Sequence, residues 1–155
     1  MRLGSGICPV SKMLEQGIKV GIGVDGSASN DSGHVLGELR QALYLARVDG
    51  GAEAMSAMDA LELGTWRAAE LIGRDDIGRI AIGFCGDCAL FPVEDLYSSG
   101  CENAVDALLL CHPRQVTDSI VGGKLQIRDG NLLPIDLGEH MYRHQRRANE
   151  LHQLN

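Results

Sequence analysis

Asp25 is the residue whose place in the sequence best suits chemistry. It directly follows the short apolar run 19–24, which predicts a buried strand, and it precedes the small-residue segment 26–33. A carboxylate at the end of a strand can bind a divalent metal ion and can accept a proton from metal-bound water. Small residues beside it let the backbone pass close to a ligand. For an Asp taken alone, a role as a helix N-cap or a turn residue is the commoner one.

Two further groups of residues have the types and spacings of metal ligands. Cys85 and Cys88 form a CxxC pair, which would suit a zinc knuckle or a redox pair. His140 and His144 lie four residues apart, where a helix would bring them to one face. The cysteines fall in an expected strand, and the histidines have polar neighbours. We therefore expect chance occurrence for the CxxC pair and a solvent-exposed face for the histidines.

The composition is that of a globular protein and argues against several classes of function. The chain has 155 residues, within the range of one domain, and 45% of them are hydrophobic, which is enough for a core. A formal net charge of -7 argues against a nucleic-acid-binding surface. The five cysteines, the lack of a signal-peptide pattern and the lack of an apolar run of about 18 residues predict a reduced, cytoplasmic protein without a membrane partner.

The first half of the chain predicts an α/β arrangement. Helices are expected at residues 9–16, 34–47 and 56–73, the last with a break at Gly64, and the strand 19–24 lies between the first two. This order is typical of parallel strands joined by helical crossovers. The helix after the Asp25 segment should bury one apolar face. That face comprises Val35, Leu36, Leu39, Ala42, Leu43 and Ala46.

The second half predicts short strands followed by a polar helix. Glycines separate the expected strands, and the pair Gly122-Gly123 is typical of a two-residue hairpin turn. A short helix is expected at 104–110 and a longer one at 137–151. The expected strands are 76–81, 87–93, 117–121 and 124–128.

One motif carries a resemblance to a known family. The run VGIGVDGSASND at residues 20–31 resembles the end of barrel strand eight in the amidohydrolase superfamily. It is similar to the branch of purine and triazine deaminases, and most of all to the 8-oxoguanine deaminases. The segments RLGSG at 2–6, ALELGT at 60–65 and GRDDIG at 73–78 also resemble family segments, as does the hairpin 121–124. The resemblance covers nearly the whole chain.

This resemblance implies a fold in three segments. The chain would be the C-terminal portion of a metal-dependent (β/α)8 TIM barrel, joined to part of a small β-sandwich domain. Residues 1–75 would be the last βα units of the barrel, residues 76–136 a segment of the sandwich, and residues 137–155 a C-terminal helix. Apolar faces without cover would favour an oligomer or association with the missing N-terminal part.

The resemblance also implies a metal-dependent hydrolytic deaminase. Asp25 would bind a divalent metal, zinc or else iron, and would pass a proton from the attacking water to the leaving ammonia. The remaining ligands, including a His-x-His pair, are not in this chain. We therefore expect the chain alone to be inactive. Four neighbours of Asp25 are expected to contact the substrate because they lie close to it in sequence: Ser27, Asn30, Asp31 and His34.

Two functions remain open at this point. In the first, the chain is part of an enzyme that uses water to cleave the C–N bond of an amino-oxopurine such as 8-oxoguanine, or of a related heterocycle. In the second, it is a non-catalytic, truncated remnant or interaction module with the same fold. The feature that favours the enzyme is Asp25 at the end of an apolar strand.

Overall fold

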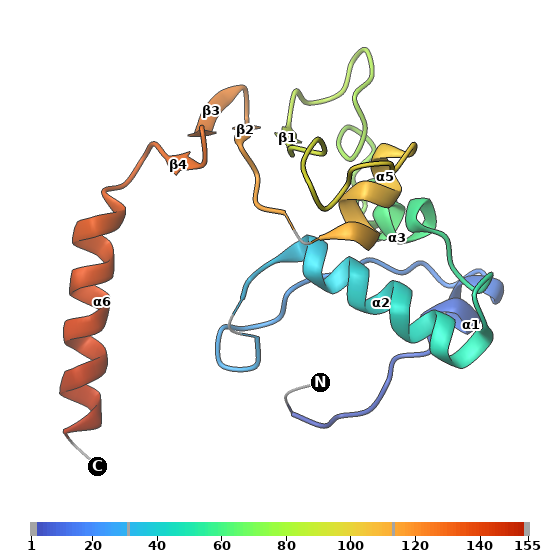
Figure 1. The fold of residues 1–155 in the computed structure, drawn as a ribbon, viewed down its shortest axis with the longest axis horizontal. Helices are drawn as coiled ribbons and strands as arrows, with labels where there is room; N and C mark the ends of the chain where they lie inside the picture. The colour runs from blue at the N-terminus through green and yellow to red at the C-terminus, as the bar shows by residue number, and fades with distance from the viewer. Residues whose placement is uncertain (1–2, 31, 113, 154–155) are drawn as a thin grey trace. The chain divides into compact units, whose positions relative to one another are not determined.

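The computed structural model describes residues 3–30, 32–112 and 114–153. Its residues form two compact units, Met1–Cys85 with Pro92–Arg114, and Gly86–Phe91 with Gln115–Asn155. The first unit is helical and the second contains a sheet and the last helix (Figure 1). The helices are α1 (Val10–Glu15), α2 (Val35–Gly50), α3 (Ala57–Leu63), α4 (Trp66–Leu71), α5 (Ala104–Asp106), the π-helical turn η1 (Ala107–Cys111) and α6 (Leu137–His152). The strands are β1 (Cys88–Leu90), β2 (Asp118–Val121), β3 (Lys124–Arg128) and β4 (Asn131–Leu132).

Helix α2 carries the central apolar face of the first unit. Leu36, Leu39, Leu43 and Ala46 are buried at the three- and four-residue spacing of one helix face. This face packs on α3 and on η1. The predicted helix 34–47 and its buried face are therefore confirmed, except that Val35 is 43% exposed and Ala42 is half-buried.

The break between α3 and α4 also follows from local sequence. Ser56 and Asp59 form the predicted capping box at the start of α3, with the Asp59 amide donating to Ser56 Oγ over 3.1 Å. At the end of the helix, a Cβ atom on Gly64 would lie 2.7 Å from Leu39 Cδ1. Glycine at this position therefore lets the chain turn directly against the α2 core.

The predicted strand at residues 19–24 is not a strand among the described residues. The segment packs on the first unit instead: Val20 is buried, and the Ile22 amide donates to the Leu63 carbonyl over 3.0 Å. A strand needs a hydrogen-bonded neighbour, and the described part of the chain brings none beside this segment. The apolar pattern thus predicted a segment that packs on the first unit through Val20, but the predicted strand structure was wrong.

The predicted strand at residues 76–81 is also wrong. The segment forms bends and turns, with Gly78 at φ +84°. A Cβ atom on Gly78 would lie 2.7 Å from Trp66 Cα, so the loop passes directly against the start of α4. The guanidinium of Arg79 lies 4.9 Å from the centre of the Trp66 ring. Contact with Trp66 therefore takes the place of strand pairing here.

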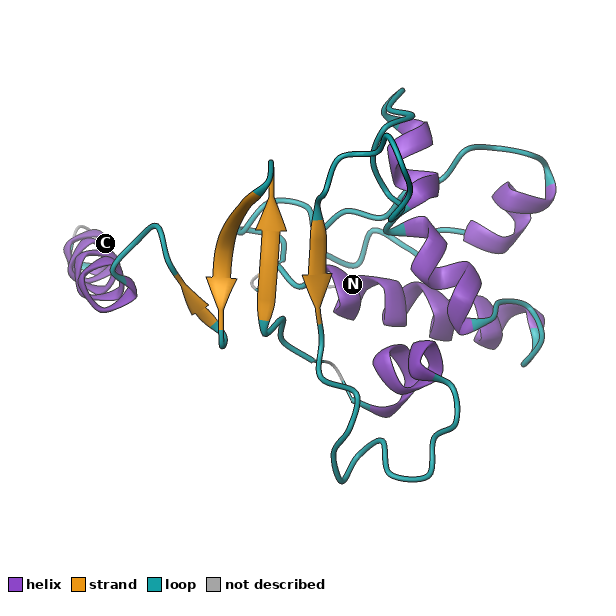
Figure 2. Cartoon of the chain, turned by 90° about the horizontal axis from the view of Figure 1, so that it is seen from above, coloured by secondary structure: helices purple, strands orange, loops and turns teal. Residues whose placement is uncertain are grey.

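The second unit contains one four-stranded antiparallel sheet in the order β1-β2-β3-β4, seen in orange in Figure 2. The predicted hairpin is confirmed: Gly122 and Gly123 have φ values of +57° and +72°, as a tight turn between β2 and β3 requires. A second turn, at Asp129 and Gly130, leads into β4. The strands described are all antiparallel, so the parallel strands that we expected from the order of elements are not found among them.

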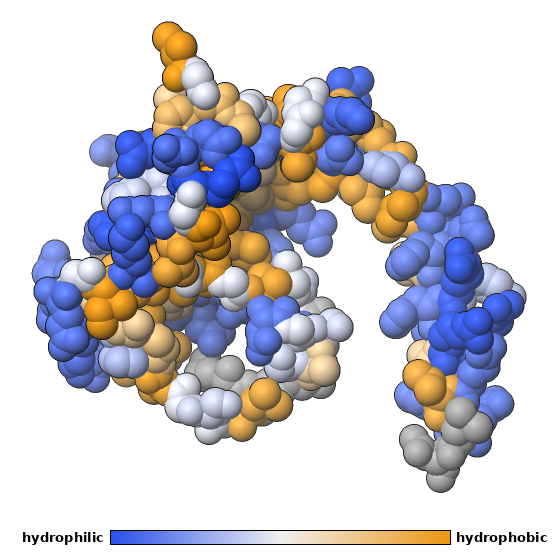
Figure 3. All heavy atoms as spheres, turned by 180° about the vertical axis from the view of Figure 1, so that it is seen from behind, coloured by the Kyte–Doolittle hydropathy of each residue, from blue (hydrophilic) through white to orange (hydrophobic). Residues whose placement is uncertain are grey.

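Helix α6 is exposed along its described length. Asp136 caps its first turn by accepting a hydrogen bond from the Glu139 amide over 3.0 Å. Its surface is mostly hydrophilic, with isolated apolar side chains such as Met141 and Leu151 (Figure 3). His140 and His144 lie on this exposed surface, as predicted. Among the described residues, none of the helices has both the length and the apolar character that a membrane span requires.

Replacing Leu43 with alanine should lower the free energy of unfolding by about 2–5 kcal/mol, because its fully buried side chain would leave a cavity between α2 and its neighbours. Urea denaturation measures the change. Val48, on the same helix but 82% exposed, is the matched control, and Val48→Ala should cost less than about 0.5 kcal/mol. Equal effects of the two substitutions would contradict the assignment of the buried face.

Candidate metal-binding loop

Asp25 lies at an exposed turn with an unusual backbone conformation. Its φ angle is +63°, in the left-handed region that Asp and Asn tolerate better than other side chains. Its Oδ1 accepts a hydrogen bond from the Gly26 amide and its Oδ2 accepts one from Ser29 Oγ, both over 2.7 Å. The carboxylate is thus held in one orientation by the loop that follows it.

The loop itself is closed by backbone hydrogen bonds. The amides of Ser29 and Asn30 both donate to the Gly26 carbonyl, over 3.0 and 2.8 Å. This turn places the Ser29 hydroxyl beside Asp25. Asp25 therefore belongs to a turn, as one alternative predicted, but it does not cap α2, whose N-cap is His34.

These two hydrogen bonds also lower the pKa of Asp25. The pKa lies below the ordinary value for Asp. The hydrogen bond from Ser29 is the larger cause and the hydrogen bond from the Gly26 amide is the second. Both bonds stabilise the ionised form. A carboxylate has about four lone-pair directions and this one uses two of them. Asp25 is therefore an ionised side chain with the remaining acceptor capacity facing solvent.

The other predicted site residues lie in different surroundings. Ser27 is exposed and its hydroxyl makes no hydrogen bond with the described residues. Asn30 is half-buried, and its Nδ2 donates to Glu38 Oε1 over 2.6 Å. Its Oδ1 accepts from the amide and the hydroxyl of Ser32, each over 3.1 Å. Asn30 thus ties the loop to α2, whereas Asp31 lies outside the described residues.

His34 has both ring nitrogens engaged. Nδ1 accepts a hydrogen bond from the Gly37 amide over 2.9 Å, which caps α2. Nε2 lies 2.9 Å from the Arg114 carbonyl oxygen. Since Nδ1 accepts, Nε2 carries the proton and donates it. A substrate contact by His34 would have to replace one of these two hydrogen bonds.

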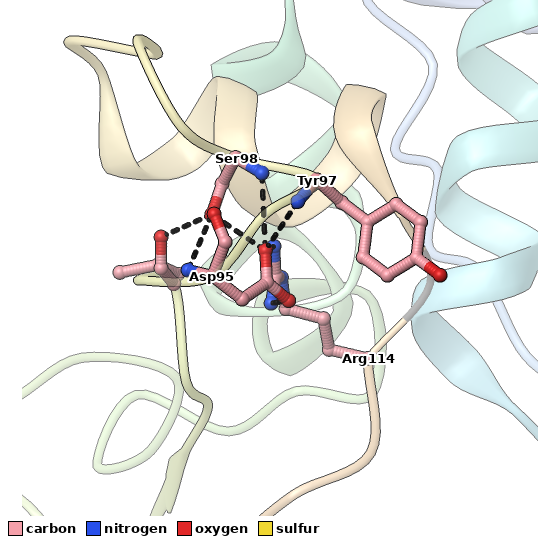
Figure 4. A network of polar contacts seen from close by, with 5 residues as sticks. Asp95, Tyr97, Ser98 and Arg114 are labelled. Atoms are coloured by element: carbon pink, nitrogen blue, oxygen red, sulfur yellow. Dashed lines mark hydrogen bonds and ion pairs between the residues drawn. The ribbon is translucent and has the colours of Figure 1, made fainter.

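One ion pair near this loop was not anticipated. The Arg114 guanidinium makes two hydrogen bonds to the Asp95 carboxylate, over 2.6 and 3.0 Å (Figure 4). The Arg114 side chain is 3% exposed. Arg114 holds the pKa of Asp95 well below its usual range. The two residues are 19 positions apart in irregular segments, so no periodicity or local motif links them.

Metal ligands other than Asp25 are not gathered elsewhere in residues 3–30, 32–112 and 114–153. This part of the chain contains no group of three or more His, Cys, Asp or Glu side chains that could hold a metal ion. The two cysteines of the CxxC pair are not joined by a disulfide, and the Cys85 thiol lies 3.4 Å from Asp76 Oδ2. Catalytic zinc sites use about three protein ligands, and the oxygen of an ionised Asp is one of the ligand types that zinc accepts. The chemistry of Asp25 fits one such ligand, and the described residues do not complete the set.

Most of the chain matches one known protein family. Residues 1–130 match the family described as "Amidohydrolase family", and this range includes the Asp25 loop and the sheet as far as the end of β3.

The chain belongs to the amidohydrolase family.

Several amidohydrolase relatives are deaminases. An 8-oxoguanine deaminase from Pseudomonas aeruginosa is 43% identical, with 97% of this chain and 34% of that protein covered. A 5-methylthioadenosine/S-adenosylhomocysteine deaminase from Halothermothrix orenii is 33% identical, with 92% of this chain and 34% of that protein covered. The chain thus spans about a third of the length of these curated relatives.

Solved structures of two other enzymes share the fold over nearly all of the chain. An adenosine deaminase from Xanthomonas campestris with bound zinc has a TM-score of 0.91 at 27% identity, covering 97% of this chain and 35% of that one. An atrazine chlorohydrolase from Arthrobacter aurescens complexed with zinc has a TM-score of 0.83 at 29% identity, covering 91% and 32%. The resemblance to the amidohydrolase superfamily is therefore confirmed, and these neighbours bind zinc.

Replacing Ser29 with alanine should raise the pKa of Asp25 toward its ordinary value, because the hydroxyl is the main group that stabilises the ionised carboxylate. With its pKa lowered in the fold, Asp25 favours the folded state above the ordinary pKa of Asp, and that contribution is lost as the pH falls. Nuclear magnetic resonance titration of the carboxyl carbon measures the shift. Ser27→Ala, in the same loop, should leave the titration unchanged, and a shift as large as that of Ser29→Ala would contradict the assignment.

Proposed function

We propose that this chain is the C-terminal part of a metal-dependent hydrolytic deaminase that acts on an amino-oxopurine, with 8-oxoguanine as the reference substrate, or on a related heterocycle. The observation that carries the proposal is an ionised, solvent-facing Asp25 within the motif VGIGVDGSASND. Identity of 43% with an 8-oxoguanine deaminase over 97% of the chain supports it.

We also propose how the chain is divided in the whole enzyme. Residues 1–75 would form the last βα units of a (β/α)8 barrel, residues 76–136 a segment of a small β-sandwich, and residues 137–155 the C-terminal helix. The similarity to solved amidohydrolases over more than 90% of the chain supports this division. Segment 19–24 would gain strand neighbours from the rest of such a barrel, since it ends at Asp25 as catalytic strands of barrels end at their active sites.

Asp25 would serve as one ligand of a divalent metal, with zinc favoured because solved neighbours hold it. When bound, the metal supplies Lewis-acid activation of a water molecule. The lowered pKa of Asp25 keeps an oxygen lone pair available for ligation at neutral pH. The hydrogen bonds from Ser29 and Gly26 hold the carboxylate so that it need not reorganise during the reaction.

Asp25 would also move the proton of the attacking water. In a hydrolytic deamination, water adds to the carbon that bears the amino group, and the amino group leaves as ammonia. The carboxylate accepts the water's proton at one oxygen and then donates it to the leaving nitrogen.

Among the four neighbours, Ser27 is best placed to contact a substrate. Its hydroxyl is exposed and makes no hydrogen bond with the described residues, so binding would not break an existing bond. Asn30 and His34 hold the loop and the start of α2. We propose that these two act on the substrate through the position of the loop, and that Asp31 contacts it directly as a neighbour of Asn30 in sequence.

A chimaera tests the proposed function. The matched third of the Pseudomonas aeruginosa 8-oxoguanine deaminase is replaced by this chain, and ammonia release is measured with 8-oxoguanine, guanine and isocytosine. We expect metal-dependent activity, and we expect Asp25→Asn to lower kcat by about 100- to 10,000-fold, because the amide is a weaker ligand and cannot carry the proton.

Asp129→Asn is the matched control for that substitution. Asp129 also has a positive φ angle, +49°, and also precedes a glycine, so the change in backbone and charge is the same. It should leave kcat unchanged within about twofold. A chimaera that folds and binds zinc but releases no ammonia from any of these compounds would overturn the deaminase proposal in favour of a non-catalytic module.

A zinc titration of the 155-residue chain tests how much of the site it supplies. Calorimetry should show weak binding without a stoichiometric end point, because one exposed carboxylate is fewer than the roughly three ligands of a catalytic zinc site. The Asp25→Asn variant should differ little from the parent chain. Tight binding of one zinc ion that is lost in Asp25→Asn would mean that this chain holds further ligands of its own.

A further inference from the structure

A side-chain bridge ties the Asp25 loop to α2. Asn30 Nδ2 donates to Glu38 Oε1 over 2.6 Å, and Glu38 lies in the first turn of α2. Asn30 Oδ1 also accepts two hydrogen bonds from Ser32, which lies between the loop and the helix. The position of the loop therefore depends on where the first turn of α2 is held.

His34 holds that first turn. Its Nδ1 accepts from the Gly37 amide, and its Nε2 donates to the Arg114 carbonyl, each over 2.9 Å. Two bonds in the plane of one ring fix both the orientation of the imidazole and the start of the helix. The partner of Nε2 is a backbone atom of a residue 80 positions away, so the helix start is fixed relative to the segment that contains Arg114.

Arg114 is in turn fixed by Asp95. The guanidinium makes its two hydrogen bonds to Asp95 while almost fully buried. Asp95 also accepts from the amides of Tyr97 and Ser98, over 2.9 and 3.0 Å, and from Ser98 Oγ over 2.9 Å (Figure 4). The Ser98 hydroxyl lies 2.6 Å from the Val93 carbonyl as well. These hydrogen bonds thus hold the Asp95 carboxylate, and with it the Arg114 guanidinium, in one orientation.

The cost of this pair indicates that its role is placement. The Arg114 side chain is 3% exposed and the Asp95 side chain 37% exposed. An ion pair with a buried partner adds little net stability, because desolvation of that partner offsets much of the attraction. Arg114 Nε is, moreover, a buried side-chain nitrogen without a hydrogen-bond partner in the described part of the chain. Unlike an apolar side chain, the Arg114 guanidinium makes a directional, charged contact. This contact holds the backbone carbonyl of Arg114 in place.

We propose that Asp95 and Arg114 are positioning residues for the Asp25 loop, acting through His34 and the first turn of α2. The proposal rests on the proposed function in that the loop it positions is the one assigned to metal binding. It assigns a role to an ion pair more than 60 residues further along the chain, on the basis of a series of hydrogen bonds that are joined through the backbone of Arg114 and of the first turn of α2.

Amide hydrogen exchange in the 155-residue chain tests the proposal without using enzyme activity. In Asp95→Asn the Arg114 charge loses its partner, so the carbonyl that receives His34 should shift. Exchange should then speed up on the order of tenfold at the amides of Gly37, Ser29 and Asn30. Exchange at Ala60 and Ala69, in α3 and α4, should change by less than about twofold.

The chain offers a matched control in a second bidentate pair. Arg74 makes two hydrogen bonds to Asp76, over 2.5 and 2.8 Å, in an exposed loop without a link to His34. Asp76→Asn removes the same charge from a bidentate Arg–Asp pair whose arginine is 48% exposed. It should leave exchange at Ser29 and Asn30 unchanged. Equal acceleration at these amides in Asp76→Asn and Asp95→Asn would overturn the proposal.

His34→Asn tests the link itself. Asn can still cap α2 but is too short to reach the Arg114 carbonyl as well, so Gly37 should stay protected while Ser29 and Asn30 exchange faster. In this background, Asp95→Asn should have no further effect on the two loop amides, which a double-mutant cycle measures. Additive effects, or a uniform loss of protection that includes α3 and α4, would show that the ion pair only stabilises the unit. Failure here would leave the chimaera's activity untouched, so the two proposals are tested separately.

Discussion

Packing of one face of α2 is the constraint on which the first unit depends. Leu39 and Leu43 are buried against α3 and η1, and the absence of a side chain at Gly64 lets the next turn approach Leu39. Apolar burial is not directional, so this packing holds the helix but does not by itself aim a side chain. The direction comes from polar contacts at the helix start, where His34 and Glu38 receive hydrogen bonds from Gly37 and from Asn30. The Asp25 loop thus combines a position set by packing with an orientation set by hydrogen bonds.

The family relationship and the site geometry support different parts of the functional argument. The family match covers residues 1–130, and the similarity to an 8-oxoguanine deaminase covers 97% of the chain. The geometry adds that Asp25 is ionised, turned toward solvent and held by two hydrogen bonds. Neither supplies the rest of a metal site, because the described residues contain no further cluster of ligands. For this reason, the deaminase reaction is proposed for a larger protein to which this chain contributes one ligand and the loop that carries it.

Local patterns in the sequence predicted the elements that depend on interactions between residues close in sequence. The spacing of leucines predicted α2, the Ser56–Asp59 pair predicted the start of α3, and Gly122-Gly123 predicted the hairpin. The errors arose where contacts from distant residues decide the outcome. Segment 19–24 has the composition of a strand but no neighbouring strand in the described chain, and segment 76–81 follows the surface of Trp66. The motif VGIGVDGSASND located Asp25. The pairing of Asp95 with Arg114 joins two irregular segments, and no sequence pattern predicted it.

The left-handed backbone of Asp25 restricts which amino acids this position can accept. With φ at +63°, most side chains would bring Cβ too close to the neighbouring carbonyl oxygen, and short polar side chains that bond to their own loop are the exceptions. Glutamate would retain the negative charge, but its longer side chain would carry the carboxylate beyond the Gly26 amide. Asparagine would retain the turn and lose the charge. Aspartate alone satisfies both the backbone and the chemistry, so the shape of the turn and the identity of the ligand are requirements on the same residue.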